Sequence, residues 1–237
     1  MLEARNISWQ IGTKKILDNI NLSLKSGSRV GIVGPNGSGK SSLLKVLSFL
    51  EPPTSGQIFF QGKKYNGRIP LAVRRRIGMV FQEPLLLNTT VQDNVGAGLR
   101  MRGLPRQDIQ QHIREWLERF GVGHLKQQQA RTLSGGEAQR VSLARAFALQ
   151  PEILFMDEPF SALDAPAKEG LLYDLTLILP GTQTTTIIVS HDFREIKQLT
   201  ERTLIMLRGE IAADAPPGEL LAGTPTQETE EFMKHWR

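Results

Sequence analysis

The 237-residue sequence contains no cysteine and no long apolar run. The missing cysteine excludes a disulfide framework, cysteine-ligated zinc, iron–sulfur clusters and thiol catalysis. The longest apolar runs, ILFM at 153–156 and IIV at 187–189, fall far short of the ~20 residues that cross a bilayer. The N-terminal segment MLEARNISWQ is polar where a secretory signal needs an apolar stretch. We therefore expect neither an export signal nor a membrane span.

Basic charge is in excess but is not concentrated. The formal net charge is +5, yet the longest run of basic residues is Arg74–Arg76. No zinc finger or other base-reading pattern accompanies the charge. We interpret the excess as a solvated basic face and expect no nucleic-acid partner.

Short β-rich segments alternate with longer amphipathic ones. Strand, helix and strand in succession are typical of a largely parallel sheet covered by helices. A hairpin-like pattern that turns at Arg208-Gly209, together with the N-terminal segments, predicts an antiparallel part as well. The predicted β-rich segments are 2–11, 16–25, 29–34, 57–61, 77–81, 152–157, 184–190 and 203–214.

Residues 89–150 contain no convincing strand and predict a helical insertion. Within it, 106–120 places apolar residues at helical spacing, and Gly121 follows where a C-terminal cap is expected. Those apolar residues are Ile109, Ile113, Trp116, Leu117 and Phe120. Without repeats or a long linker, we expect one domain over 1–237. It would have a β-rich core at about 1–88 and 151–222, the helical insertion at 89–150, and a short tail at 223–237.

A glycine-rich loop joins the β-rich segment 29–34 to a helical pattern. Its glycines let successive N–H groups turn inward toward phosphate oxygens. Lys40 supplies charge to the β- and γ-phosphates, and Ser41 offers a hydroxyl to Mg²⁺. A plain strand-to-helix turn does not account for the full pattern, so we predict a site for a nucleoside triphosphate. Its residues are Gly34, Pro35, Asn36, Gly37, Ser38, Gly39, Lys40, Ser41 and Ser42.

A second glycine-bearing helix start occurs in Leu133-Ser-Gly-Gly-Glu137. Ser134 and Glu137 have the spacing of a capping box, which begins many ordinary helices. Gly135 and Gly136 would occupy the first helical positions, where each costs on the order of 1 kcal/mol of helix propensity. A cap alone does not explain them. A helix start with bare N–H groups predicts a second anion site.

LSGGE followed by AQR resembles the signature of the ABC ATPase family, and nearly the whole chain follows that family's order of motifs. The resemblance implies an α/β fold of the P-loop NTPase (RecA-like) type. It has a mostly parallel core, an antiparallel β subdomain and a helical subdomain. The resemblance also implies a head-to-tail dimer with a second copy or a homologous cassette. The residues that would close over the partner's γ-phosphate are Ser134, Gly135, Gly136 and Glu137.

The same resemblance assigns further site residues. Asp157 and Glu158 end an apolar segment and resemble the Walker B motif, so Asp157 would hold Mg²⁺ and Glu158 would act on the attacking water. Asp164 lies in a segment like the D-loop, which communicates across the dimer. The residues with implied catalytic roles are Glu158, His191, Gln82 and Lys40, and the implied Mg²⁺ ligands are Ser41, Gln82 and Asp157.

The expected adenine contact departs from the family's pattern. The family stacks an aromatic ring on adenine just before a glycine, and here Ile11 precedes Gly12. Trp9, on the same face of the strand, is a candidate for that stacking. An aromatic in a small sheet core is an equally good interpretation.

The implied function is that of an ATP-hydrolysing subunit on the cytoplasmic side of the cell membrane, held there by a separate membrane-spanning permease. A free cassette favours an importer. The segments FQEPLLLNTTV and EPFSALD resemble bacterial importers of small solutes, including inorganic oxyanions. A substrate-binding protein is then a further partner. Two alternatives stay open: a soluble ABC ATPase outside transport, and the ATPase of a lipid or drug exporter.

Overall fold

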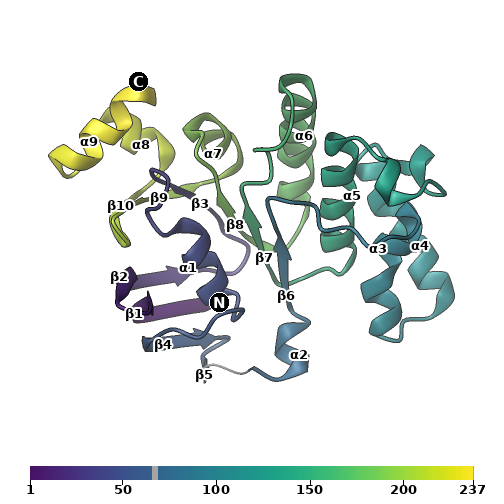
Figure 1. Ribbon diagram of the computed structural model, residues 1–237, viewed down its shortest axis with the longest axis horizontal. Helices are drawn as coiled ribbons and strands as arrows, with labels where there is room; N and C mark the ends of the chain where they lie inside the picture. Colours follow the sequence, from purple (N-terminus) through teal and green to yellow (C-terminus); the bar gives the residue numbers. More distant parts are fainter. Residues whose placement is uncertain (66–68, 237) are drawn as a thin grey trace.

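The computed structural model describes residues 1–65 and 69–236 and contains two β-sheets flanked by helices (Figure 1). The smaller sheet is antiparallel, in the order β2-β1-β4-β5. The larger sheet has the order β10-β9-β3-β8-β7-β6. The strands are β1 (Leu2–Ile11), β2 (Lys14–Leu24), β3 (Arg29–Val33), β4 (Ser55–Phe60), β5 (Lys63–Tyr65), β6 (Ile77–Val80), β7 (Ile153–Asp157), β8 (Thr185–Val189), β9 (Arg202–Leu207) and β10 (Glu210–Ala215).

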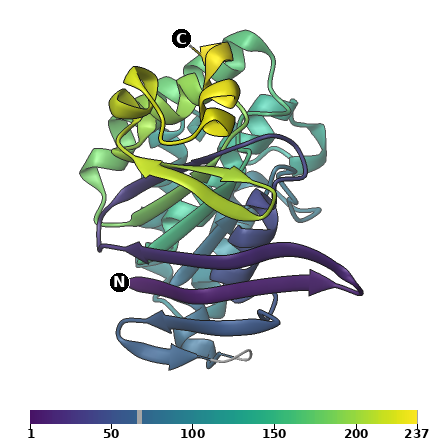
Figure 2. The same cartoon turned by 90° about the vertical axis from the view of Figure 1, so that its left-hand side faces the viewer.

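The larger sheet is parallel except at one edge. Strands β6, β7, β8, β3 and β9 pair in parallel, and β10 returns antiparallel to β9. The turn between β9 and β10 places Arg208 at φ 49 and Gly209 at φ 87, which confirms the predicted hairpin. Figure 2 shows β1 and β2 lying below this hairpin, where Asp18 N donates to Gly209 O at 2.9 Å. The short strand β5 was not among the predicted segments.

Strand β7 reads as a continuous apolar run because both of its faces are buried. Ile153 and Phe155 point into the core between the two sheets and α1. Leu154 and Met156 point to the opposite face, into the core shared with the other helices. Since successive side chains of a strand alternate between faces, a sheet covered on both sides needs apolar residues at every position. The layered fold thus follows from the sequence pattern.

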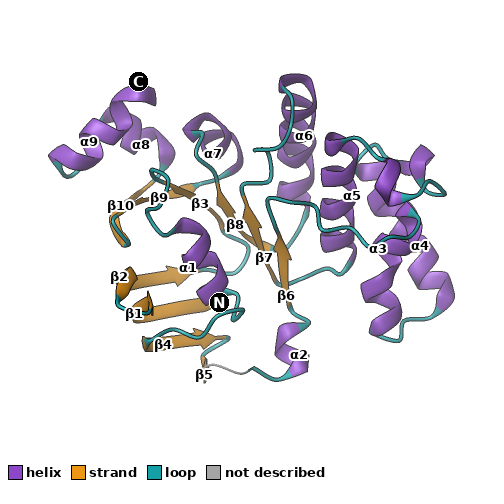
Figure 3. Ribbon diagram, in the orientation of Figure 1, coloured by secondary structure: helices purple, strands orange, loops and turns teal. Residues whose placement is uncertain are grey.

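Helices cover the larger sheet and gather beyond β6 (Figure 3). The predicted helix over 106–120 is confirmed as α4, which ends where Gly121 adopts φ 68. Its Trp116 stacks on Phe147 of α5, with ring centroids 5.2 Å apart. The helices are α1 (Lys40–Leu47), α2 (Leu71–Arg74), α3 (Val91–Met101), α4 (Arg106–Arg119), α5 (Gly135–Ala148), α6 (Ala165–Ile178), α7 (Phe193–Leu199), α8 (Pro217–Ala222) and α9 (Gln227–Met233).

The helical region also agrees with the sequence. Residues 89–150 form α3, α4 and α5 with short 3-10 turns, and their only β pairing is an isolated bridge between Thr90 and Gln129. Across 1–65 and 69–236, none of the helices combines the length and the apolar character that a bilayer crossing needs.

Candidate functional site

The glycine-rich loop connects the carboxyl end of β3 to the start of α1. Gly39, the N-cap residue of α1, adopts φ 100, and a Cβ there would lie 2.9 Å from Ile16 O. Gly37 adopts φ 79. Any side chain at Gly39 would be strained and crowded, so the loop can curl tightly only with glycine at this position.

Lys40 is held inside this loop. Its side chain is buried, and Nζ donates to Gly34 O at 2.9 Å and to Pro35 O at 3.0 Å. Burial lowers the pKa of Lys40, while the negative charges of Glu158 and Asp157 act in the opposite direction. A buried ammonium has lost most of its hydration, and its attraction to a negative charge is stronger than in water. Lys40 is therefore suited to bind a polyanion that enters the loop.

The start of α1 is open to an anion. The N-cap makes no side-chain hydrogen bond, and the first turn carries no acidic residue. The Ser38 hydroxyl is buried without a hydrogen-bond partner among the described residues. Unpaired donors and the positive end of a helix suit phosphate oxygens. A cavity of about 380 Å³ lies here, lined by Lys14, Ile16, Asn36, Gly37, Gly39, Lys40, Ser41, Ser42 and Glu158.

Asp157 lies beside this loop at the carboxyl end of β7. The Ser41 hydroxyl donates to Asp157 Oδ1 at 2.8 Å, although the two residues are 116 positions apart in sequence. Burial raises the pKa of Asp157, and the hydrogen bond from Ser41 partly offsets this rise. A carboxylate and a hydroxyl together are hard oxygen ligands of the kind Mg²⁺ prefers, so this pair fits that ion.

Glu158 follows β7 and His191 comes after the neighbouring strand β8, and the two side chains lie next to each other. Glu158 N donates to Val189 O of β8 at 3.0 Å, and the residue adopts φ 46, which is uncommon for a residue with a side chain. Its Oε2 lies 3.1 Å from His191 Nδ1. The His191 side chain is 55% exposed and that of Glu158 only 17%, so Glu158 lines the cavity while His191 contacts it from the solvent side.

Gln82 lies further from this group. It follows β6, the strand next to β7, so it sits at the same edge of the sheet as Asp157. Its side chain is exposed and does not line the described part of the cavity. The structure thus places Gln82 at the same edge of the sheet as Asp157 without joining it to Ser41 and Asp157.

The LSGGE segment forms the capping box that its spacing predicts. Ser134 N donates to Glu137 Oε2 at 2.8 Å, and Glu137 N donates back to Ser134 Oγ at 3.3 Å. The Ser134 N–H and the Ser134 hydroxyl, which both donate to the Glu137 carboxylate, lower the pKa of Glu137. Ser134 and Gly135 are exposed, and residues 133–137 contribute nothing to the described lining of the phosphate-loop cavity. Within one chain, the two helix starts therefore lie apart.

The two glycines of this segment face the region after β7. A Cβ on Gly136 would lie 3.1 Å from the Ala167 side chain, and one on Gly135 would lie 3.7 Å from Ala162 O. Asp164, also exposed, caps α6 by accepting a hydrogen bond from Ala167 N at 2.9 Å. Close helix packing therefore explains Gly136, whereas Gly135 remains open to the surface.

Two cavity residues were missed from sequence. Lys14 and Ile16 of β2 line the site beside the phosphate loop. The available signal was the Ile11-Gly12 turn, because the strand that follows it passes the loop. Trp9 instead packs, partly buried, against the core between the two sheets and α1 and is outside the described lining. This packing is the alternative interpretation of Trp9, and its contact with adenine stays a prediction.

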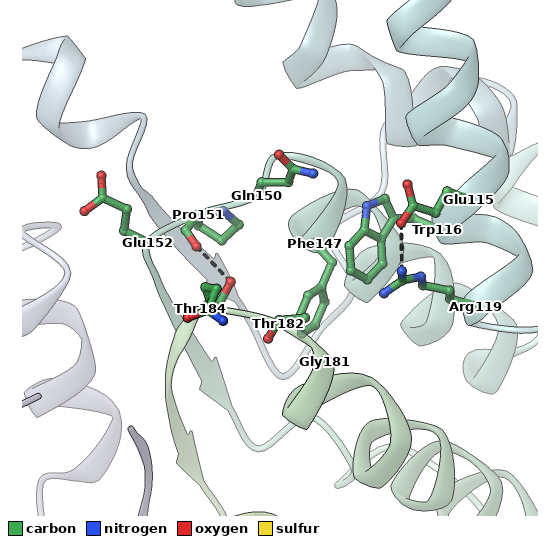
Figure 4. A pocket seen from close by; sticks show the side chains of 11 residues that line it. Glu115, Trp116, Arg119, Phe147, Gln150, Pro151, Glu152, Gly181, Thr182 and Thr184 are labelled. Carbon is green, nitrogen blue, oxygen red and sulfur yellow. Dashed lines mark hydrogen bonds and ion pairs between the residues drawn. The ribbon is translucent and has the colours of Figure 1, made fainter. Parts of the chain in front are cut away.

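A second cavity, also of about 380 Å³, lies between α4, the end of α5 and residues 181–184 (Figure 4). Figure 4 shows Trp116 and Arg119 on one side of it and Thr184 and Pro151 on the other. The cavity contains none of the predicted site residues. The candidate site is therefore the cavity at the phosphate loop.

The family model described as ABC transporter matches residues 17–161. The glutamine transport ATP-binding protein GlnQ of Escherichia coli is 36% identical over 239 residues, which cover 99% of each chain. The sulfate/thiosulfate import ATP-binding protein CysA of Yersinia pseudotuberculosis is 37% identical over 98% of this chain.

The chain covers a different fraction of the length of each of these relatives. The chain spans 65% of the length of that CysA. It spans 62% of the CysA of Mesostigma viride, which is 38% identical over 91% of this chain. Similarity to the CysA proteins therefore concerns a part of their length, whereas similarity to GlnQ concerns nearly all of it.

Solved structures resemble the whole fold. CbiO1 of Clostridium perfringens, part of the transporter complex cbiONQ, has a TM-score of 0.85 at 27% identity and covers 100% of this chain and 94% of its own. The dimeric cassette MJ0796 bound to ADP and Pi has a TM-score of 0.81 at 28% identity, over 92% of this chain and 99% of its own. These likenesses confirm the predicted α/β fold of the P-loop NTPase type with a nucleotide site. The chain belongs to the ABC transporter family, among its ATP-binding cassettes.

Proposed function

We propose that this chain hydrolyses ATP and thereby energises transport through a separate membrane-spanning permease. One observation supports this above the others: residues from three distant parts of the sequence come together around the phosphate loop. Lys40 and Ser41 come from α1, Asp157 and Glu158 from the end of β7, and His191 follows β8. Charge for phosphate, oxygen ligands for a metal ion and a candidate base are thus collected in one place.

The reaction follows from these positions. The loop N–H groups, the start of α1 and Lys40 would hold the phosphates and stabilise the negative charge that develops on the γ-phosphoryl group. Mg²⁺, bound by Ser41 and Asp157 with Gln82 nearby, would supply further positive charge. Glu158 would accept a proton from the attacking water or orient it, and His191 would contact the γ-phosphate from the exposed side.

The site would be completed by a second copy of the chain or a homologous cassette. The exposed helix start formed by Ser134, Gly135 and Gly136, capped by Glu137, would close over the phosphates held by the partner's loop. Asp164 would lie in the same contact. The exposure of Ser134 and Gly135, away from the chain's own cavity, supports this arrangement.

The transported solute is proposed from the relatives. CysA is named for sulfate and thiosulfate import and GlnQ for glutamine transport, so an importer of a small solute, with an inorganic oxyanion as the first candidate, fits them best. A permease and a substrate-binding protein would be partners, and the chain would sit at the cytoplasmic face of the membrane. We also propose the division of a single domain 1–237 into the β-rich core, the helical insertion and the tail at 223–237.

Co-expression with the membrane proteins encoded beside it tests this function. We expect a multi-spanning protein to co-purify with the chain, and the complex to hydrolyse ATP faster when solute and binding protein are present. Copurification with ribosomes or DNA, and no membrane protein, would contradict transport. It would favour the non-transport ATPase instead. Stimulation by a lipid or drug would favour the exporter.

Nucleotide selectivity should be weak. Apart from the phosphate loop and Glu158, which is proposed to act on the water, the described cavity is lined by Lys14 and Ile16 and by no aromatic side chain. An aliphatic side chain and a flexible cation offer neither a stacking plane nor a fixed hydrogen-bond pattern for a base. We expect the KM values for ATP and GTP to differ by less than about tenfold, because one net hydrogen bond to a base contributes only about 1 kcal/mol to binding. Steady-state kinetics with both nucleotides, on the wild type and on Trp9→Phe, measures this. A strong preference for ATP that Trp9→Phe weakens would instead assign adenine stacking to Trp9.

A further inference from the structure

A buried group of ion pairs lies beside His191 and has no part in the mechanism proposed above. Glu195, in the first turn of α7, is 2% exposed. Its Oε1 pairs with the ammonium of Lys168 and finds no other hydrogen-bond partner within the described chain. The same ammonium lies 3.3 Å from Asp192 Oδ2. Lys168 therefore bridges two buried carboxylates: without it Glu195 would be a buried charge with no ionic partner, whereas Asp192 would keep only its pair with Arg194.

These two carboxylates hold the backbone on both sides of His191. Glu195 Oε2 accepts a hydrogen bond from Ser190 Oγ at 2.5 Å, and Ser190 Oγ accepts one from Asp192 N at 2.9 Å. Asp192 Oδ1 accepts a hydrogen bond from Arg194 N at 2.9 Å, which caps α7. The residues before and after His191 are thus tied to one buried frame, and the histidine itself projects outward from it.

Lys168 connects this frame to the segment that follows Glu158. Lys168 N donates to Asp164 O at 2.9 Å in the first turn of α6. Closer to the site, Ser161 N and Ser161 Oγ donate to Glu158 O at 3.2 Å and 3.0 Å. A short, hydrogen-bonded segment therefore runs from Glu158 to Lys168, and the lysine reaches across to the loop of His191.

The charge of Lys168 is secured by its partners. Burial lowers the pKa of Lys168, but the pairing with Glu195 and Asp192 outweighs this effect and raises the pKa above its ordinary value. The pKa of Asp192 is lowered: burial acts to raise it, and the hydrogen bonds from Arg194 and the charges of Lys168 and Arg194 outweigh burial. Both directions favour the charged forms of Lys168 and Asp192 near neutral pH.

We propose that Lys168 is a positioning residue for the ATPase reaction: it fixes the His191 loop against α6 so that His191 stays beside Glu158. This inference rests on the proposed function. Lys168 does not line the described cavity, so it acts through Asp192 and Glu195 and not on the substrate. Because α6 begins at the exposed Asp164, where a second copy is proposed to dock, a shift of that helix would also move the His191 loop.

Replacing Lys168 with Met tests this role by removing the charge while keeping most of the length of the unbranched side chain. With the full chain in its complex, we expect kcat to fall roughly 10²-fold, because a catalytic group misplaced by about 1 Å costs that much. The KM for ATP should stay within about threefold, since the phosphate loop is untouched. Lys168→Arg, which keeps the charge, should restore most of kcat. Lys197→Met, a change of an exposed lysine on α7, should leave both constants unchanged.

The outcomes separate the inference from the function on which it rests. A wild-type complex that hydrolyses ATP, with Lys168→Met at the wild-type kcat, overturns the positioning role alone. A rise in KM without a fall in kcat, or a Lys168→Arg variant as slow as Lys168→Met, overturns it as well. A wild-type complex without ATPase activity overturns the proposed function instead. If Lys168→Met does not fold, Lys168→Met/Glu195→Gln removes both charges together, and wild-type kcat in that variant overturns the role.

Discussion

Glu158→Gln should lower the rate of ATP hydrolysis by about 10²- to 10⁴-fold, the range that general acid–base catalysis contributes. Glutamine matches the size of Glu158 but cannot accept a proton from the attacking water. Its amide can still meet His191 Nδ1, 3.1 Å away in the wild type, so the local geometry should survive. ATP affinity should be retained, because the phosphates are held by the loop and Lys40.

Phosphate release under saturating ATP measures the rate, and size-exclusion chromatography with ATP follows the dimer. We expect Glu158→Gln to accumulate as an ATP-bound dimer, since binding brings the copies together and hydrolysis separates them. Glu219→Gln, which changes an exposed carboxylate on α8, is the matched control and should behave as the wild type. Normal turnover by Glu158→Gln would show that another group activates the water.

Lys40→Ala should weaken nucleotide binding by about 10²-fold, or about 3 kcal/mol, the scale for removing one partner of a buried charged hydrogen bond. Two effects combine. The cation that faces the β- and γ-phosphates is lost, and so are the hydrogen bonds from Nζ to Gly34 O and Pro35 O that brace the loop. Arginine would not substitute, because its planar fork does not fit where a compact ammonium is enclosed.

Equilibrium titration with a fluorescent ATP analogue, at constant Mg²⁺ and salt, measures this loss. Lys64→Ala, on the exposed surface of β5, is the control for the removal of one positive charge. A thermal melt of each variant in the absence of nucleotide separates lost binding from lost folding. Lys40→Ala that binds ATP as the wild type does would place the phosphates elsewhere and would remove the basis of the proposed site.

Much of the site could be predicted because its residues lie at the ends of strongly patterned elements. The apolar β7 run ends at Asp157 and Glu158, and the β-rich segment before Gly34 leads into the phosphate loop, so each position is set by the strand before it. The capping box of Ser134 and Glu137 is equally local, and local hydrogen bonds follow from spacing alone. Gln82 and Trp9 were harder to place, because an exposed loop glutamine and a strand aromatic have no short-range signal that fixes their partners.

The sequence by itself determined the alternating layers, the helical insertion and the two glycine-bearing helix starts, because periodicity and turn chemistry act over a few residues. Only the tertiary structure decided which strands are neighbours, with β3 between β8 and β9, since pairing depends on long-range packing. It alone placed Lys14 and Ile16 in the cavity and showed the hydrogen bond from Ser41 to Asp157, two residues that the sequence linked only through the family resemblance. The ion pairs of Lys168 with Asp192 and Glu195 likewise depend on the tertiary structure. The lysine lies on α6 and the carboxylates at the start of α7, so the charges meet only where the two helices pack together.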